Sequence, residues 1–281
     1  MKIAIITGAS SGMGREMARL LAERSGCLDE LWLCARRQER LSALSEELSG
    51  VRSAGQRPLR LRFFTGDLCK EAVCSEIGAA LASEQPEILF LVNAAGFGKI
   101  GRVSELSSEV QEEMLRLNCG ATLRLCRLCL PYMKRRLGRI INFASAAAFL
   151  PQPQFAVYAA SKAFVLSFSE ALREELRGTQ VAVTAVCPGP VKTEFFGIAE
   201  ELHAVALYKK LFMADAARVC EAAFQDSLRR KAVSVYGFSM KAFQLLTHVL
   251  PHGLLLSCMR VINRDSRQQT EKGEENRCRS L

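Results

Sequence analysis

Two side chains suited to proton transfer, Tyr158 and Lys162, lie four residues apart in the segment YAASK. In a helix, this spacing places both side chains on the same face. Tyrosine has an ordinary pKa of about 10 and is a poor base at neutral pH. A neighbouring ammonium group favours the phenolate, so we expect Lys162 to lower the pKa of Tyr158. The pair predicts general acid–base chemistry at the oxygen of a carbonyl or an alcohol.

A glycine-rich turn, TGASSGMG at residues 7–14, predicts a nucleotide-binding loop. An apolar run precedes it and a helical pattern follows, which is the setting of a dinucleotide-binding βαβ unit. Glycines let the backbone approach a pyrophosphate closely, and the helix N-terminus offers free N–H groups to it. The alternative is a tight turn that binds nothing. The loop residues expected to contact a cofactor are Gly8, Ser10, Ser11, Gly12, Met13 and Gly14.

The residues after the second apolar run, Ala35-Arg36-Arg37, predict which nicotinamide nucleotide is bound. A protein that binds NAD has a carboxylate here, which holds the ribose 2′-hydroxyl. This sequence has none, and a guanidinium group binds a 2′-phosphate through paired hydrogen bonds. We therefore expect NADP(H), held by Arg36 and Arg37, with Arg15 as a third candidate. A solvated surface charge is the alternative for each arginine.

Strands that alternate with helices must position these groups. Apolar runs typical of buried parallel strands occupy Lys2–Thr7, Glu30–Ala35, Leu59–Phe64, Ile88–Val92, Arg139–Ala144, Val181–Cys187 and Ala232–Tyr236. Helical patterns occupy Gly14–Arg24, Lys70–Ser83, Glu109–Lys134, Phe155–Arg177 and Asp215–Arg230, and a helix with a polar loop fills Arg36–Arg57. Gly120 suggests two helices within the third pattern. The alternation predicts an α/β fold of the Rossmann type, a doubly wound parallel seven-stranded sheet with helices on both faces.

An apolar C-terminal helical extension, residues 239–263, follows the last predicted strand. Lys241 and Arg260, close to its ends, are its only charged residues. Pro251 and Gly253 lie near its centre and argue against a membrane-spanning helix. The segment is expected to be a lid over the substrate or a subunit interface, and peripheral membrane contact is the alternative.

In their order along the chain, these motifs resemble the short-chain dehydrogenase/reductase family, over roughly residues 1–236. The matching pieces are TGASSGMG, Asp67-Leu68, NAAG at 93–96, Asn118, Ser145, YAASK and PGPVKT at 188–193. Ser145 precedes Tyr158 by 13 residues, which is the family's spacing for its catalytic serine. Ala94 and Ala144 stand where the family often has Asn and Ser, and both positions tolerate the change. Within the family the chain is similar to NADP-preferring hydroxysteroid dehydrogenases and 3-oxoacyl reductases.

The resemblance implies a role for each matching residue. Tyr158 would donate and accept the proton. Lys162 would adjust the pKa of Tyr158 and hold the nicotinamide ribose, and Ser145 would hydrogen-bond the substrate oxygen. Asn118 would hold a helix kink and a water of a proton relay. The remaining expected cofactor contacts are Asp67 and Leu68 at the adenine, Asn93, Ala94 and Gly96 at the cofactor edge, and Pro188, Gly189, Val191 and Thr193 at the nicotinamide end.

Composition narrows the class of protein. With 281 residues, 49% of them hydrophobic, the chain is long enough for one large globular domain, which we place at residues 1–263 before a polar, disordered tail at 264–281. The 11 cysteines are expected to be reduced thiols in a cytoplasm, since no secretory signal is evident. We expect no metal site. We also expect no nucleic-acid partner, because the basic residues behind the net charge of +9 are scattered and match no nucleic-acid-binding motif.

The substrate is expected to be a lipophilic small molecule. The segment that the family uses as its substrate loop carries Phe195, Phe196, Ile198, Leu202, Val205, Leu207, Tyr208, Leu211 and Phe212. Apolar walls favour the ketone and secondary alcohol of a hydroxysteroid or bile-acid-like molecule. The alternatives are a 3-oxoacyl thioester, carried on acyl-carrier protein or coenzyme A, and an NADP-binding regulator without turnover. The resemblance also implies a homodimer or homotetramer.

Overall fold

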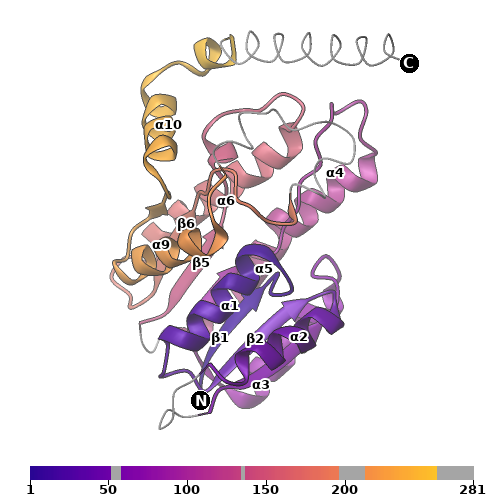
Figure 1. Ribbon diagram of the computed structural model, residues 1–281, viewed down its shortest axis with the longest axis vertical. Helices are drawn as coiled ribbons and strands as arrows, with labels where there is room; N and C mark the ends of the chain where they lie inside the picture. Colours follow the sequence, from indigo (N-terminus) through magenta and orange to yellow (C-terminus); the bar gives the residue numbers. More distant parts are fainter. Residues whose placement is uncertain (52–57, 134–136, 196–212, 258–281) are drawn as a thin grey trace, which may run out of the picture.

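A seven-stranded parallel sheet forms the centre of the computed structural model, which describes residues 1–51, 58–133, 137–195 and 213–257 (Figure 1). The strands lie in the order β3-β2-β1-β4-β5-β6-β7. Their bounds are β1 Lys2–Thr7, β2 Glu30–Ala35, β3 Arg60–Thr65, β4 Glu87–Asn93, β5 Arg139–Phe143, β6 Ala182–Val186 and β7 Val233–Ser234. The predicted fold class is confirmed.

Burial along the strands explains why the sequence forms this sheet. Every residue of β2 and β6 is buried, as expected for strands covered by helices on both faces. The edge strand β3 keeps Arg60 and Thr65 exposed. At the other edge β7 is only two residues long, shorter than the predicted Ala232–Tyr236, and Gly237 then turns the chain with a φ of 86°.

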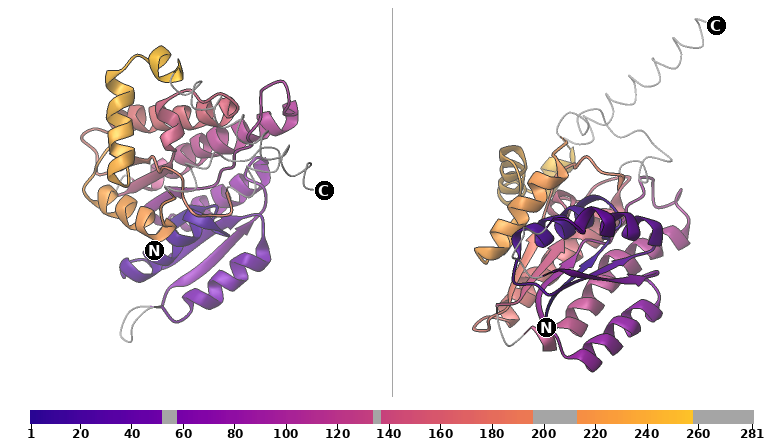
Figure 2. Two further views of the ribbon diagram at one scale, coloured as in Figure 1. Left: turned by 45° about the horizontal axis from the view of Figure 1, so that its top comes forward. Right: turned by 60° about the horizontal axis from the view of Figure 1, so that its bottom comes forward.

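Two layers of helices cover the sheet, as the two views of Figure 2 show. On one face lie α1 (Gly12–Arg24), α2 (Gln38–Leu48) and α9 (Ala216–Leu228), whose apolar side chains share one core with the strands. On the other face lie α3 (Glu71–Glu84), α5 (Thr122–Cys129) and α6 (Ala156–Glu175). Each layer buries the strand residues that point toward it, so successive residues of β1 belong to different cores.

The predicted helix Glu109–Lys134 is divided in an unexpected way. It begins as α4 (Ser108–Leu115), passes through a π-helical turn at Arg116–Ala121, and continues as α5 and a short 3₁₀ turn, Leu130–Tyr132. Gly120 therefore does not separate two helices but lies in a widened turn. A π-turn inside an α-helix frequently marks a functional site.

The strand order places the ligand crevice. Neighbouring β1 and β4 are followed by connections that leave in opposite directions, to β2 on one side and β5 on the other. In open α/β sheets, ligands bind beyond the carboxyl ends of the strands at such a switch point. The glycine loop follows β1 and the NAAG segment begins at the end of β4, so both lie at this crevice.

The C-terminal extension begins as α10 (Phe238–Val249), which lies along one side of the molecule (Figure 1). One side of it packs on the 3₁₀ turn Ala146–Phe149, where the Phe243 and Phe149 rings lie 6.5 Å apart. The outer side exposes Phe238, Leu245 and Val249. Among the described residues, no helix is both long and apolar enough to span a membrane.

Candidate active site

The first turns of α6 carry Tyr158 and Lys162, both buried and both on the side that faces the crevice. The Phe155 ring stacks on Tyr158 with centroids 4.2 Å apart, and the Phe195 ring lies 5.3 Å away. Ser145 follows β5 and caps a 3₁₀ turn, where its Oγ accepts a hydrogen bond from the Ala147 N–H at 3.1 Å. The predicted serine, tyrosine and lysine thus come together from β5 and α6.

The pKa of Tyr158 is raised to about 12, mainly because burial disfavours the phenolate. A hydrogen bond with Ser145 opposes this shift. The pKa of Tyr158 thus departs from its ordinary value in the direction opposite to the lowering that the sequence predicts. The Lys162 ammonium lies 5.8 Å from the ring centroid and donates instead to the Phe143 carbonyl at 2.8 Å. Tyr158 is consequently a protonated phenol at neutral pH, which suits it to donate a proton.

Lys162 titrates much closer to neutrality than an ordinary lysine. Burial lowers its pKa to about 8, while the nearby Cys119 and Cys187 oppose the shift. The ammonium is therefore charged at neutral pH and loses its proton in mildly alkaline solution. Cys187 directly follows β6, and burial raises the pKa of its thiol to about 12, so it is not a thiolate at neutral pH.

Asn118 lies buried in the π-helical turn, where its amide clamps the backbone of Phe97. Its Oδ1 accepts from the Phe97 N–H at 3.1 Å, and its Nδ2 donates to the Phe97 carbonyl at 3.0 Å. Nδ2 also donates to Ser161 Oγ at 2.9 Å, which joins the turn to α6. The Asn118 side chain thus holds Phe97, the residue after the NAAG segment, against α6. Its part in a proton relay stays a prediction.

The glycine loop and the NAAG segment approach each other so closely that side chains would not fit. A Cβ atom on Gly14 would lie 2.3 Å from the Gly8 carbonyl oxygen, and one on Gly8 would lie 2.9 Å from the Ala95 nitrogen. Gly8 also has a φ of 67°, which favours glycine. Thr7 links the two segments, because its Oγ1 accepts from the N–H groups of Ala94 and Ala95.

A second close approach lies at the nicotinamide end of the expected cofactor site. A Cβ atom on Gly96 would lie 2.7 Å from Asn118 Oδ1 and 3.3 Å from Lys162 Nζ. Together with the bare backbone of the glycine loop at the N-terminus of α1, this is what a dinucleotide requires. The residues present therefore fit the nicotinamide nucleotide that the sequence predicts.

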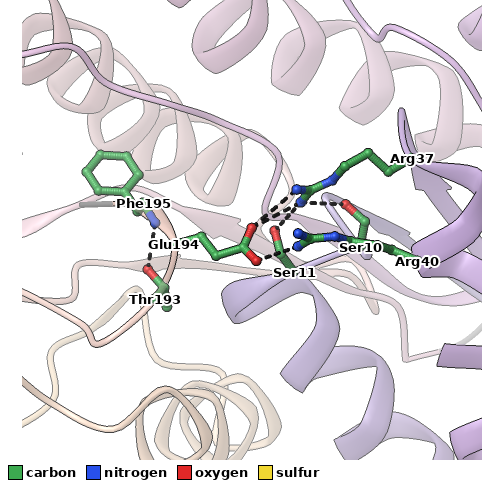
Figure 3. Close-up of polar contacts among 7 residues, drawn as sticks. All are labelled: Ser10, Ser11, Arg37, Arg40, Thr193, Glu194 and Phe195. Atoms are coloured by element: carbon green, nitrogen blue, oxygen red, sulfur yellow. Dashed lines mark hydrogen bonds and ion pairs between the residues drawn. The ribbon is translucent and has the colours of Figure 1, made fainter. Parts of the chain in front are cut away.

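Of the two predicted phosphate-binding arginines, the structure turns only Arg37 toward the glycine loop. Arg37 donates to Ser11 Oγ at 3.0 Å and to Ser10 Oγ at 3.4 Å (Figure 3). The Arg36 side chain is mostly exposed and pairs with Glu113 of α4 at 3.7 Å. Arg15 pairs with Glu47 of α2 at 2.6 Å.

Two residues missed by the sequence reasoning join Arg37 in this corner of the site. Arg40 of α2 and Glu194 form an ion pair, and Glu194 also binds Arg37 at 3.3 Å (Figure 3). The spacing of Arg37 and Arg40 across the start of α2 is a signal that could have identified Arg40. Glu194 gave none, because its contacts reach across more than 150 residues of chain.

The other predicted cofactor residues have structural partners of their own. Asp67 Oδ1 accepts from the Cys69 N–H at 2.9 Å and so shapes the turn between β3 and α3, while Leu68 is buried in the core. Asn93 Nδ2 donates to Asn142 Oδ1 at 2.8 Å, and among the described residues its Oδ1 has no hydrogen-bond partner. Their predicted contacts with the cofactor stay predictions.

A cavity of about 510 Å³ lies above Ser145, Tyr158 and Lys162. Its lining includes predicted cofactor residues from three further segments: Met13, Ala94, Gly96, Pro188, Gly189, Val191 and Thr193. Its remaining walls are mainly apolar and include Phe155, Phe195, Met240 and Phe243. The C-terminal extension thus contributes a wall through α10. Of the predicted substrate-loop residues only Phe195 is described, and the other eight lie outside the described residues.

Comparisons with known proteins agree with this geometry. An 11-beta-hydroxysteroid dehydrogenase of Pinus massoniana is 34% identical over 69% of this chain and 52% of its own length. A short-chain dehydrogenase from Sphingobium yanoikuyae in complex with NADPH is 28% identical, with a TM-score of 0.73 over 89% of this chain and 96% of its own. A short-chain dehydrogenase/reductase from Burkholderia phymatum in complex with NAD is 25% identical, with a TM-score of 0.73 over 88% and 92% of the two chains.

The family model described as short chain dehydrogenase matches residues 2–201, which include the glycine loop and the Ser145, Tyr158 and Lys162 cluster. The matched region is well over half of the chain and holds every predicted catalytic residue. The protein is therefore an oxidoreductase that belongs to the short-chain dehydrogenase family.

Proposed function

We propose that the protein uses NADP(H) to interconvert a ketone and a secondary alcohol on a lipophilic substrate of the hydroxysteroid or bile-acid class. The observation that carries this proposal is the cavity, whose apolar walls enclose the hydroxyls of Ser145 and Tyr158. Its volume of about 510 Å³ falls in the range typical of small-molecule sites. The similarity to an 11-beta-hydroxysteroid dehydrogenase supports the same substrate class.

The polar groups that line the cavity are suited to act on a carbonyl oxygen. NADP(H), when bound, supplies or accepts the hydride. Tyr158 donates its phenolic proton to the oxygen as charge develops there, and Ser145 provides a second hydroxyl donor. With a Tyr158 pKa of about 12, the phenol is protonated at neutral pH, as its role as proton donor in ketone reduction requires.

Lys162 holds a positive charge beside Gly96, and we place the nicotinamide ribose there. A Cβ atom on Gly96 would lie 3.3 Å from Nζ, and the absence of a side chain at this position supports the placement. The proposed preference for NADP(H) over NAD(H) rests on Arg37, which contacts Ser11 of the glycine loop, and on Arg40, which shares Glu194 with it. Within the described residues, Glu194 is the only acidic side chain paired with either arginine. We also propose a cytoplasmic location, on the expectation of reduced cysteines.

A substrate panel at fixed NADPH tests the proposal. We expect oxidation of NADPH with 3-, 7-, 11-, 12- or 17-oxosteroids or oxo-bile acids, and much slower oxidation with 3-oxoacyl thioesters. A faster reaction with the thioesters would assign the protein to the 3-oxoacyl reductases. No turnover with any carbonyl, while NADPH still binds, would instead identify an NADP-binding regulator.

A further inference from the structure

The carboxylate of Glu194 is paired with the two guanidinium groups that we propose bind the cofactor's 2′-phosphate. One carboxylate oxygen lies 3.3 Å from both terminal nitrogens of Arg37, and the other pairs with Arg40 (Figure 3). Arg37 at the same time contacts Ser10 and Ser11 of the glycine loop. This corner therefore already holds an anion, supplied by the protein itself.

A carboxylate and a phosphate monoester bind a pair of arginines in the same way. Both present oxygen atoms that accept paired, charge-assisted hydrogen bonds from guanidinium groups. The two arginines also hold the pKa of Glu194 below its ordinary value, so the side chain is ionised at neutral pH. An ionised Glu194 and a 2′-phosphate would repel each other if both were bound to these arginines.

We propose that Glu194 is a specificity-determining residue that acts as an internal mimic of the 2′-phosphate and must leave Arg37 and Arg40 when NADP(H) binds. The inference rests on the proposed NADP(H) site. It predicts that Glu194 lowers the affinity for nucleotides with a 2′-phosphate and has little effect on nucleotides without one.

The neighbours of Glu194 connect this exchange to the rest of the site. A Cβ atom on Gly12 would lie 3.5 Å from the Thr193 side chain, so Thr193 covers the glycine loop. Phe195 lies against the Tyr158 ring with centroids 5.3 Å apart. Glu194 therefore lies between two residues that contact the expected pyrophosphate site and the catalytic tyrosine.

Calorimetric titration with adenosine 2′,5′-bisphosphate and with adenosine 5′-monophosphate tests the proposal, because the two probes differ only in the 2′-phosphate. Exposed ion pairs contribute modestly, so we expect Glu194→Gln to tighten bisphosphate binding by about fivefold and to change monophosphate binding by less than about twofold. In an Arg40→Ala background the gain from Glu194→Gln should shrink, since one of its two partners is gone.

Glu39→Gln is the matched control. Glu39 is exposed on α2 next to Arg40, and no ion pair joins it to Arg37 or Arg40 among the residues that the structure describes. The control removes an equal charge from the same corner and should leave bisphosphate binding nearly unchanged. An equal gain in both variants would overturn the proposal, since general charge would then explain it. Unchanged or weaker bisphosphate binding by Glu194→Gln would also overturn it.

The wild-type protein separates this inference from the proposed function. If wild-type protein binds both probes equally, the NADP(H) preference is wrong. In that case a gain in bisphosphate affinity for Glu194→Gln, absent from Glu39→Gln, would still show that Glu194 competes for the arginines. Weaker monophosphate binding by Glu194→Gln would show that Glu194 holds the ribose, which contradicts the inference.

Discussion

At the residue scale, the chemistry depends on how burial shifts the pKa values of two neighbouring ionisable groups. The same desolvation raises the pKa of Tyr158 and lowers that of Lys162, because each shift favours the uncharged form. The YAASK motif predicted both residues, but not these directions. Sequence spacing gives which side chains share a helix face, whereas the Lys162 bond to the Phe143 carbonyl depends on how α6 packs on β5.

The Lys162 pKa sets a pH limit on ketone reduction. Below about pH 8 the ammonium is charged and can hold the nicotinamide ribose, and as the pH rises through about 8 it loses its proton. We expect kcat/KM for NADPH in the reductive direction to fall above about pH 8. Tyr158 stays protonated until about pH 12 and should not contribute to this limb. A rate that stays constant to pH 10, measured with a stable substrate, would disprove the assignment.

At the element scale, the sequence predicted the order of strands and helices but not all their limits. Six of the seven strands lie within one residue of their predicted ends, because buried parallel strands are apolar throughout. The edge strand β7 is shorter, since only Val233 and Ser234 pair with β6. The resemblance implies a helix kink at Asn118, but its π-helical form was not predicted, because Asn118 and its partner Phe97 are brought together by tertiary packing.

A buried chain of polar groups joins β4, β5 and α6 beneath the site. Asn93 donates to Asn142, and Asn142 donates to Ser169 at 2.9 Å. Asn142→Ala removes the middle link, so Asn93 Nδ2 keeps only the Cys126 sulfur at 3.4 Å and Ser169 Oγ keeps only the Val165 carbonyl at 2.6 Å. Because two buried hydrogen bonds are lost, we expect the free energy of unfolding to fall by about 2 kcal/mol. Urea denaturation measures this change.

Ser169→Ala serves as the graded comparison for Asn142→Ala. It breaks one of the two links, so we expect a loss of about 1 kcal/mol. Equal stability of all three proteins would mean that the chain of hydrogen bonds contributes nothing to holding α6 against the sheet.

At the scale of the whole molecule, the cavity depends on parts of the chain that the motifs do not reveal. Met240 and Phe243 form a wall of it, and a Cβ atom on Gly189 would lie 2.6 Å from Met240 Sδ. The inner side of α10 therefore lines the cavity, and the predicted role of residues 239–263 as a lid or a subunit interface stays a prediction. Peripheral membrane contact through its outer side stays a prediction.

We propose that the molecule forms a homodimer or homotetramer through α5 and α6, as the family resemblance implies. Leu123 on α5 and Phe164 on α6 are exposed, and Phe164 stacks on Phe168 with ring centroids 5.8 Å apart. Phe164→Glu places a charge in this surface and should shift the protein to monomers in light scattering. Phe238→Glu on α10, where the side chain is 88% exposed, should keep the oligomer. A monomeric wild-type protein would refute the prediction.

We propose that Tyr158 protonates the carbonyl oxygen of a lipophilic ketone while NADPH supplies the hydride. The most direct measurement compares Tyr158→Phe with the wild-type protein on a ketone that the panel identifies. Loss of one general acid typically costs on the order of 10²–10⁴ in rate, so we expect kcat to fall by at least about a hundredfold. The Kd for NADPH should change by less than about twofold, since the ring itself remains and only the hydroxyl is lost. Near-normal turnover by Tyr158→Phe would contradict the mechanism.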